Sequence, residues 1–334
     1  MVNYYIERTI QALLTVFAVI TLSFGMIRFL PGGPMDYLRA QLIDQSDGQV
    51  DMERINRRVE RYTNVQPDEA LLDQYVSYMT RILQGNLGHS IWYDMSVNEI
   101  LIASLPWTIF VMSLSIFFTF GIGITLGAAM GYAEASQFDS ISSVISILTN
   151  SIPYYILAVM ALYLVGYRYP IFPTGGRVAD GVSGLDFYVS ALYHAVLPVT
   201  SFVVTAFGLQ ALAMRGNSIR VLGDDYLRVA KLRGLPSHII AFRYVGRNAI
   251  LPMYTGLMIS IGFLFGGAVI LEEIFRYPGV GYYMFQAISA RDYPLMMGAF
   301  IVITVAVVIS VYIADLTYGK LDPRASGGDD REAY

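Results

Sequence analysis

The sequence predicts an all-α integral membrane protein with six transmembrane helices and a small extracytoplasmic domain between the first and second helices. Hydrophobic residues make up 55% of the 334 residues and charged residues only 14%, whereas soluble domains carry about 25% charged residues. Six apolar segments reach the roughly 20 residues that cross a bilayer as a helix. So few charged residues cannot make an ordinary soluble surface, and those present gather in the segments between the spans.

The six predicted spans follow one another along the chain. The first could be mistaken for a signal peptide, but it is too long and no small-residue cleavage site follows it, so we expect it to be retained. The spans are Thr9–Leu30, Leu105–Tyr132, Ile141–Gly166, Ala195–Met214, Ile250–Leu271 and Leu295–Tyr318. They divide the chain into an N-terminal helix (1–30), an extracytoplasmic segment (31–104), a transmembrane core (105–318) and a cytoplasmic tail (319–334). The composition of the tail predicts disorder.

The most basic segment between spans sets the predicted orientation. Residues 215–252 hold seven basic and two acidic side chains, a net charge of +5 in a chain of net charge −4. The positive-inside rule places this segment in the cytoplasm, and both chain termini with it. Residues 31–104 are then outside, where Asp36–Glu99 contains eleven acidic and six basic residues. The loop Ala133–Ser140, which contains Glu134 and Asp139, gives this orientation no support.

Two kinds of helical pattern stand out. Asp68–Leu83 in the external segment carries an apolar stripe typical of an amphipathic helix. The stripe is Leu71, Leu72, Tyr75, Val76, Met79 and Leu83. Rows of small residues, which let helices approach closely, predict tight packing within this chain or against a partner. The rows are Gly123, Gly127 and Gly131, and Gly262 with Gly266.

The basic segment is expected to contain a first short helix over Tyr226–Arg233. Asp224 or Asp225 can cap it, because a carboxylate accepts the free N–H groups of the first turn. Gly234 can end it in a left-handed conformation.

A second short helix is predicted after this break. Pro236 prevents the first helix from continuing. Ser237 can cap a helix that runs from His238 to about Arg247. A helix, a glycine break and a second helix that leads into a membrane span form a shape suited to docking another protein.

Several enzyme classes lack the residues they need. The chain has no cysteine, which excludes disulfides, thiolate metal sites and Cys nucleophiles. Both lysines are followed by leucine, which excludes a Walker-type phosphate loop. The three histidines are too far apart in sequence for a metal-ligand motif. The acidic pairs Asp224/Asp225 and Glu272/Glu273 sit at span ends, where we expect caps or solvated groups.

The span interiors hold almost no ionisable residues, which disfavours a self-energised carrier. The polar exceptions near the span ends are Arg28, His194, Arg215, Asn248 and Asp315. An ion-coupled secondary carrier or channel without ATPase partners stays an alternative, because backbone carbonyls can also bind Na⁺. A membrane enzyme or scaffold is the third reading, but no nucleophile–base or metal constellation supports it. What remains is a membrane path with no energy source of its own and a cytoplasmic docking segment.

The basic segment resembles the coupling motif of ABC-importer permeases, most closely those of the dipeptide/oligopeptide/nickel group. Asp225–Gly234 reads DYLRVAKLRG, and Phe242–Pro252 is similar to that group's H-A-L-R-N-A-L-L-P. The named Glu-Ala-Ala is Arg228-Val229-Ala230 here, so only the last Ala matches. Other matching pieces are Phe29–Pro34, Gly85–Ser90, Glu272–Gly281, Arg291–Pro294 and Leu321–Arg324. Gln45–Pro67 looks like an insertion.

The resemblance implies a type I ABC importer transmembrane fold and the first, B-type, permease subunit of an ATP-driven importer in the plasma membrane. It implies three kinds of protein partner: a second homologous permease, two ABC ATPases and an extracytoplasmic solute-binding protein. ATP and Mg²⁺ would bind the ATPases, so this chain needs no cofactor, metal or catalytic residue, and no nucleic acid. The solute, a short peptide or similar molecule, stays open among dipeptides, oligopeptides, nickel and sugars.

The resemblance also implies which residues couple to the ATPases. They are Asp225, Tyr226, Arg228, Ala230, Arg233, Gly234, Leu235, Ile239, Phe242, Arg247, Asn248 and Pro252. Apolar contacts are expected from Leu232, Leu235, Ile239, Ile240 and Phe242, and a charged rim from Arg228, Lys231, Arg233 and Arg243. The alternative is a basic loop on anionic lipid headgroups. Pro278, Gly279 and Gly281 are candidate contacts for the binding protein, with a plain surface turn as the alternative.

Overall fold

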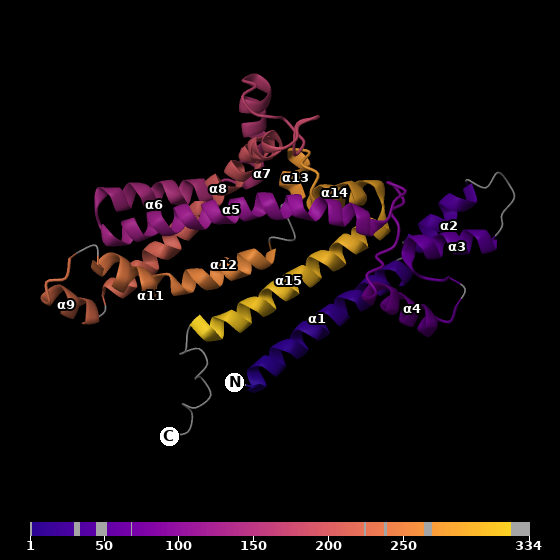
Figure 1. Cartoon of the computed structure of the whole chain (residues 1–334), viewed down its shortest axis with the longest axis horizontal. Helices are drawn as coiled ribbons and strands as arrows, with labels where there is room; N and C mark the ends of the chain where they lie inside the picture. The colour runs from indigo at the N-terminus through magenta and orange to yellow at the C-terminus, as the bar shows by residue number, and fades with distance from the viewer. Residues whose placement is uncertain are drawn as a thin grey trace. The chain divides into compact units, whose positions relative to one another are not determined.

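A computed structural model describes residues 2–29, 34–44, 52–67, 69–223, 225–236, 239–263 and 269–321. Helices dominate these ranges (Figure 1), and within them the only β pairing is an isolated bridge between His89 and Ser96. The predicted all-α class is confirmed. The predicted disordered tail lies almost entirely outside the described ranges.

Four long helices coincide with predicted spans. They are α1 (Val2–Phe29), α5 (Val97–Tyr132), α8 (Leu185–Leu222) and α15 (Tyr293–Leu321). Each contains an apolar stretch long enough to cross a membrane. The chain is therefore a multi-pass membrane protein, as predicted.

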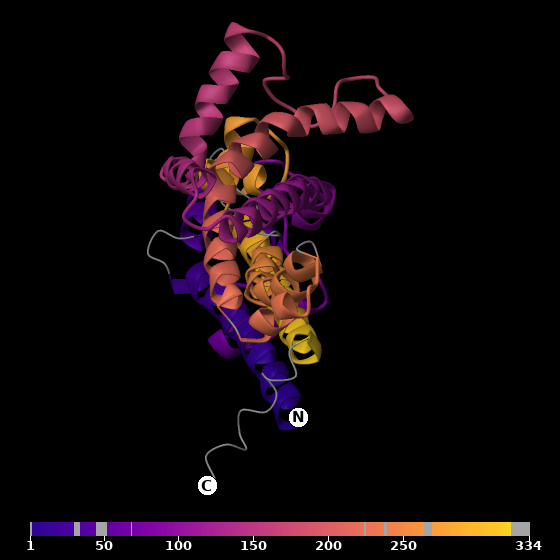
Figure 2. The same cartoon turned by 90° about the vertical axis from the view of Figure 1, so that its left-hand side faces the viewer.

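The third predicted span, Ile141–Gly166, is not one straight helix. It consists of α6 (Gln137–Asn150) and of α7 (Tyr154–Ala161) with its π-helical continuation η1 (Leu162–Arg168). The two arms meet at 85°, and Figure 2 shows α7 turning away from α6. Pro153 stands at the break, where its ring disfavours helix in the preceding residue. This bent pair raises the number of candidate spans among the described residues from four to five at most.

The fifth predicted span, Ile250–Leu271, is described only in part. The helix α12 (Leu251–Phe263) covers its first half, and the short helix α13 (Val269–Ile274) lies at its end. Residues 264–268, including Gly266 of the second glycine row, lie outside the described ranges. The total of six spans therefore stays a prediction.

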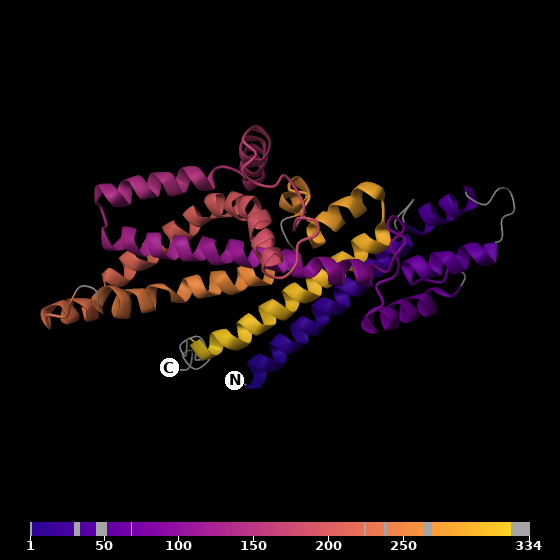
Figure 3. The same ribbon diagram turned by 45° about the horizontal axis from the view of Figure 1, so that its top comes forward.

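The chain forms two compact units, and the first contains α1, the start of α5, α14 (Val280–Ala290) and most of α15. It also holds α2 (Pro34–Asp44), α3 (Met52–Thr63) and α4 (Leu71–Leu83). Figures 1 and 3 show α1 and α15 side by side. Hydroxyls of Thr9 and Tyr312 are 2.9 Å apart, and Ile27 shares a buried cluster with Met297, so the two helices are antiparallel neighbours.

The helix predicted within Asp68–Leu83 is confirmed as α4, but its apolar stripe is not its packed face. The buried residues are Gln74, Tyr78 and Ile82, whereas much of the stripe is exposed. The polar side chain of Gln74 can be buried because its amide N–H groups donate hydrogen bonds of 2.8 and 3.3 Å to two backbone carbonyls of the preceding turn.

The second unit is built on close contact between α5, α6 and α8. A Cβ atom at Gly127 of α5 would lie 2.2 Å from the carbonyl oxygen of Ala211, and Gly123 and Gly131 approach α8 as closely. On another side of α8, a Cβ at Gly208 would lie 2.3 Å from the carbonyl oxygen of Ser146 in α6. The first glycine row therefore serves packing within this chain.

Candidate functional site

The basic segment leaves α8 at Gly223 and forms a hairpin of two helical arms (residues 225–249), here called the coupling hairpin after the family motif that its sequence resembles. Its first arm, α9 (Asp225–Leu232), confirms the helix predicted over Tyr226–Arg233. Asp225 lies in the first turn, where a negative charge favours the helix dipole. Asp224, the other candidate cap, is not among the described residues.

Gly234 ends the first arm in the left-handed conformation that the sequence predicts. Its φ angle is +67°, a value that costs a residue with a side chain about 1 kcal/mol or more. The N–H of Leu235 donates a 3.4 Å hydrogen bond to the carbonyl of Ala230, five residues earlier. This bond belongs to the Schellman ending of a helix and satisfies one of its last carbonyls.

The second arm is helical, as predicted, but it is wound as a π-helix, η2 (Ile240–Gly246), followed by the short helix α11 (Arg247–Ala249). The carbonyl of Pro236 accepts hydrogen bonds from the N–H groups of Ile239 and Ile240 at 3.0 and 3.2 Å. The predicted cap at Ser237 and start at His238 fall outside the described ranges.

The inside of the hairpin is apolar. Leu227 and Ala230 of α9 are 1% and 3% exposed, and Ile240 and Val245 of η2 are each 5% exposed. Contacts join α9 to η2, and η2 and α11 to α8. One expectation is therefore wrong: Ile240 packs inside the hairpin rather than offering a contact to a partner. Ala230 is likewise placed to support the hairpin.

The outside of the hairpin leaves apolar side chains uncovered in this chain. Leu232 and Val229 are 82% and 54% exposed, and Tyr226 is 39% exposed. Arg233 and Arg243 are exposed, while Leu235 and Ile239 are partly buried. The side chains of Arg228, Lys231, Phe242 and Arg247 are not described. The face of α9 thus offers a few exposed apolar groups beside arginine.

The two arms are tied together by Asn248, which follows the π-helix. Its Nδ2 donates to the hydroxyl of Tyr226 at 2.9 Å and to the carbonyl of Tyr244 at 3.0 Å. The Tyr226 and Tyr244 rings stack, with centroids 6.5 Å apart and planes at 28°. Pro252 lies in the first turn of α12, where its missing N–H costs no helix hydrogen bond.

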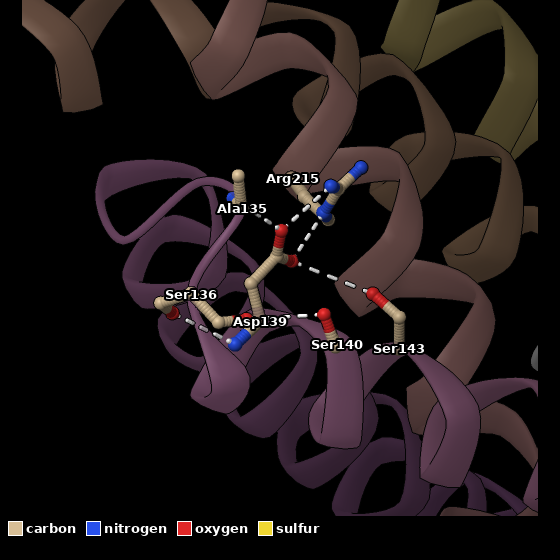
Figure 4. Close-up of polar contacts among 6 residues, drawn as sticks. All are labelled: Ala135, Ser136, Asp139, Ser140, Ser143 and Arg215. Carbon is tan, nitrogen blue, oxygen red and sulfur yellow. Dashed lines mark hydrogen bonds and ion pairs between the residues drawn. The ribbon is translucent and has the colours of Figure 1, made fainter.

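A buried ion pair anchors α8 just before the hairpin (Figure 4). Oδ1 and Oδ2 of Asp139 accept hydrogen bonds from Nε and Nη2 of Arg215 at 2.5 and 2.7 Å. Oδ2 also accepts from the N–H of Ala135 at 3.1 Å, and Oδ1 from the hydroxyl of Ser143 at 3.4 Å. Ser136 caps α6 by accepting the N–H of Asp139. The Asp139 side chain is 3% exposed and that of Arg215 is 30% exposed.

This pair places the turn between α5 and α6 at the same end of the second unit as the coupling hairpin. The sequence alone did not predict this pair, although it shows an acid in one loop and an arginine at the start of the basic segment. Ala135 in that turn has a left-handed φ of 60°, and the carboxylate of Asp139 holds its N–H. One side chain therefore fixes the turn, the start of α6 and α8.

The candidate contacts for a binding protein lie at the start of α14. Gly279 and Gly281 are buried and Pro278 is half-buried. The backbone N–H of Val280 donates to the hydroxyl of Thr108 at 2.8 Å. Of these three candidates, only Pro278 therefore keeps part of its surface accessible in this chain.

The acidic pair before this turn differs from expectation. Glu272 is 2% exposed and lies in the first turn of α13, so of the two expected roles the solvated group is wrong for it. Burial raises the pKa of the nearby Tyr277 hydroxyl, the charge of Glu272 raises it further and that of Arg177 lowers it. Glu272 therefore belongs to a buried polar cluster. Among the residues that the structure describes, no three His, Asp or Glu side chains are grouped to hold a metal ion.

Comparison with known proteins covers the coupling hairpin and most of the membrane core. Residues 123–327 match the family described as "Binding-protein-dependent transport system inner membrane component". The chain belongs to this family. It is a permease subunit, which forms the membrane path of a transport system.

Relatives of this permease match along almost its whole length. The dipeptide transport system permease protein DppB of Bacillus subtilis is 28% identical over 325 residues, 97% of this chain and 98% of the relative. The oligopeptide transport system permease protein AppB of the same organism is 28% identical over 327 residues, 97% of this chain and 99% of the relative. The di/tripeptide transport system permease protein DppB of Pseudomonas aeruginosa is 27% identical over 337 residues, 96% and 98% of the two chains.

Proposed function

We propose that this chain is the first permease subunit of an ATP-driven importer for short peptides or similar small solutes. The named relatives are permeases for dipeptides, di/tripeptides or oligopeptides and match nearly the whole chain. The observation that carries the coupling role is the hairpin at residues 225–249. It follows α8 directly, its interior is packed, and it exposes Val229 and Leu232 on α9.

The hairpin suits a groove on an ATPase subunit. Leu232 and Val229 would be buried in the groove, since exposed apolar groups gain most from a partner. Arg233 and Arg243 would lie at the rim and orient the two proteins. An anionic lipid surface would also attract the arginines, but it does not account for the ordered glycine ending and the tie between Tyr226 and Asn248.

The proposed orientation places the hairpin and both termini in the cytoplasm, with six spans. The Asp139–Arg215 ion pair supports this orientation. Arg215 of the basic segment neutralises the charge of Asp139, so the acidic loop at 133–140 counts less against a cytoplasmic position. Under this orientation residues 31–104 form the extracytoplasmic domain. The proposed partners are a second homologous permease, two ABC ATPases that bind ATP and Mg²⁺, and a solute-binding protein.

Transport would be a shift of population between inward-facing and outward-facing packings of the helices. Closure of the ATPases would move the hairpin, and α8 would carry the movement into the membrane. Because α5, α6 and α8 approach one another at glycines, these three helices would move together rather than bend separately.

The test is replacement of Gly234 by proline in the assembled transporter. Proline cannot adopt the positive φ of this position, so uptake and co-purification of the ATPases are expected to be lost while membrane insertion stays normal. Gly181→Pro is the matched control, because Gly181 also has a positive φ, +74°, with open space around it. Normal uptake by Gly234→Pro would contradict the proposal. Uptake by the purified chain alone, driven by an ion gradient without ATP, would favour a secondary carrier.

A further inference from the structure

The helix α4 has two apolar faces, and this chain covers only one of them. Tyr78 and Ile82 are 2% and 8% exposed and belong to the core of the first unit. Leu72, Val76 and Leu83 are 72%, 55% and 70% exposed. Because these three follow at spacings of four and seven residues, they form a single stripe along the helix. An apolar stripe of this kind indicates a second contact.

Side-chain contacts fix the level of α4 along the membrane helix α1. The hydroxyls of Tyr75 and Thr21 are 2.8 Å apart, and the ring of Phe24 lies 5.3 Å from that of Tyr75 and 5.7 Å from that of Tyr78. Thr21 and Phe24 precede the end of α1 at Phe29 by eight and five residues. These spacings correspond to roughly 12 and 8 Å along the axis. The inner face of α4 therefore lies beside the last turns of an apolar span, not beyond its end.

Contacts with the helix α15 independently place α4 at the same depth. Tyr78 and Ile82 line a small cavity together with Met297 and Ile301 of α15. Met297 and Ile301 lie four and eight residues inside the apolar span Tyr293–Ile313, or roughly 6 and 12 Å from its start. The helix α15 itself runs from Tyr293 to Leu321. It starts directly after the charged residues Arg291 and Asp292, so its start lies at the membrane boundary.

Aromatic side chains mark this boundary as well. The rings of Tyr37 and Tyr293 meet edge to face at 6.4 Å. Trp92 is 66% exposed, and its backbone N–H donates to the carboxylate of Asp292 at 3.1 Å. Trp and Tyr gather where membrane and water meet. The inner face of α4 packs on the apolar side of this boundary, so its outer face is at the depth of lipid.

We propose that α4 is an interfacial helix, partly inserted in the leaflet at the C-terminal end of α1, with Leu72, Val76 and Leu83 among the upper acyl chains. Helices of this kind bury their apolar face about 5–10 Å deep, which overlaps the roughly 6–12 Å that the contacts with α1 and α15 give. One face of α4 holds α1 and α15 together, and the other holds the unit to the bilayer. Which leaflet this is rests on the orientation proposed above, whereas the insertion itself does not.

The experiment uses the absence of native cysteine. Leu72→Cys, Val76→Cys and Leu83→Cys are each made in the full chain, labelled with bimane and measured in native membranes and in phosphatidylglycerol-containing vesicles. Shallow doxyl-labelled lipid and aqueous iodide are the two quenchers. The control is Arg57→Cys on α3. The side chain of Arg57 is 68% exposed and that of its ion-pair partner Glu53 is 81% exposed, so this position faces water.

The expected result is loss of most bimane fluorescence with doxyl lipid and little loss with iodide at all three stripe positions, and the reverse at position 57. Iodide quenching of the stripe equal to the control would overturn the proposal. So would protection from both quenchers in native membranes, because a partner protein would then cover the stripe. Reaction of position 57 with an impermeant thiol reagent from the cytoplasmic side would refute the proposed orientation and leave the insertion standing.

Discussion

The side chains of Asp139 and Arg215 join the start of α6 to α8 across 76 positions of sequence. Arg215 lies two helical turns before the end of α8 at Leu222, where the coupling hairpin begins. The bidentate geometry and the burial of the carboxylate make this the strongest polar contact described near the hairpin. Any movement of the hairpin that α8 transmits therefore reaches α6 as well.

Removal of this carboxylate should destabilise the end of the core that carries the coupling hairpin. In Asp139→Asn the guanidinium of Arg215 loses its counter-charge and the left-handed Ala135 loses a charged acceptor. Breaking a buried pair from one side costs about 3 kcal/mol, so we expect a lower melting temperature of the purified transporter and lower uptake. The melting temperature is measured by thermal unfolding followed by fluorescence.

The matched control for this change is Glu134→Gln in the same turn. Glu134 is exposed, so its loss of charge should leave the melting temperature nearly unchanged. Equal effects of the two variants would show that the buried pair has no special role.

The link between Tyr226 and Asn248 predicts a coupled effect on the hairpin. Tyr226→Phe keeps the ring stacked on Tyr244 but removes the acceptor of the 2.9 Å hydrogen bond. A double-mutant cycle with Asn248→Ala should give an interaction free energy of about 0.5–1 kcal/mol. Peptide-stimulated ATPase activity of the assembled transporter is the measurement, and strictly additive losses would contradict the link.

An acidic residue at the exposed tip of α9 should weaken ATPase binding without unfolding the chain. Leu232 is 82% exposed, so Leu232→Glu removes no packing within the permease. If this side chain is buried by the ATPase, the affinity should fall about tenfold or more. Quantitative co-purification of the ATPases measures the loss.

Leu185→Glu is the control for this substitution, because Leu185 is 78% exposed at the other end of α8. It should retain the ATPases. Normal ATPase recovery with Leu232→Glu would place the contact elsewhere on the hairpin.

Local sequence chemistry predicted the parts of the fold that depend on neighbouring residues. Gly234 and Pro236 marked the end of α9, because glycine adopts a left-handed conformation easily and proline fixes its own φ and lacks an N–H. The bend at Pro153 was not predicted, because the apolar run from Ile141 to Gly166 has the length of one span and a proline can also merely kink a helix.

Contacts between residues far apart in the sequence could not be predicted from the sequence. The apolar stripe on α4 indicated a helix but not its packed side, and the structure buries Tyr78 while Leu72 stays exposed. Hydrophobic periodicity reports that a face needs covering, and only tertiary contacts say which face the chain itself covers. The pairing of Asp139 with Arg215 was hidden for the same reason.

Two glycines of α5, Gly127 and Gly121, differ sharply in the space that a side chain would find beside them. A Cβ at Gly127 would meet the carbonyl oxygen of Ala211 at 2.2 Å, whereas nothing lies within 4 Å of one at Gly121. Gly127→Val should force α5 away from α8 and cost about 1–3 kcal/mol, seen as a lower melting temperature and lost uptake. Gly121→Val adds the same side chain to the same helix and should leave both nearly unchanged. If the two variants behaved alike, intrinsic helix propensity rather than contact with α8 would explain the effect.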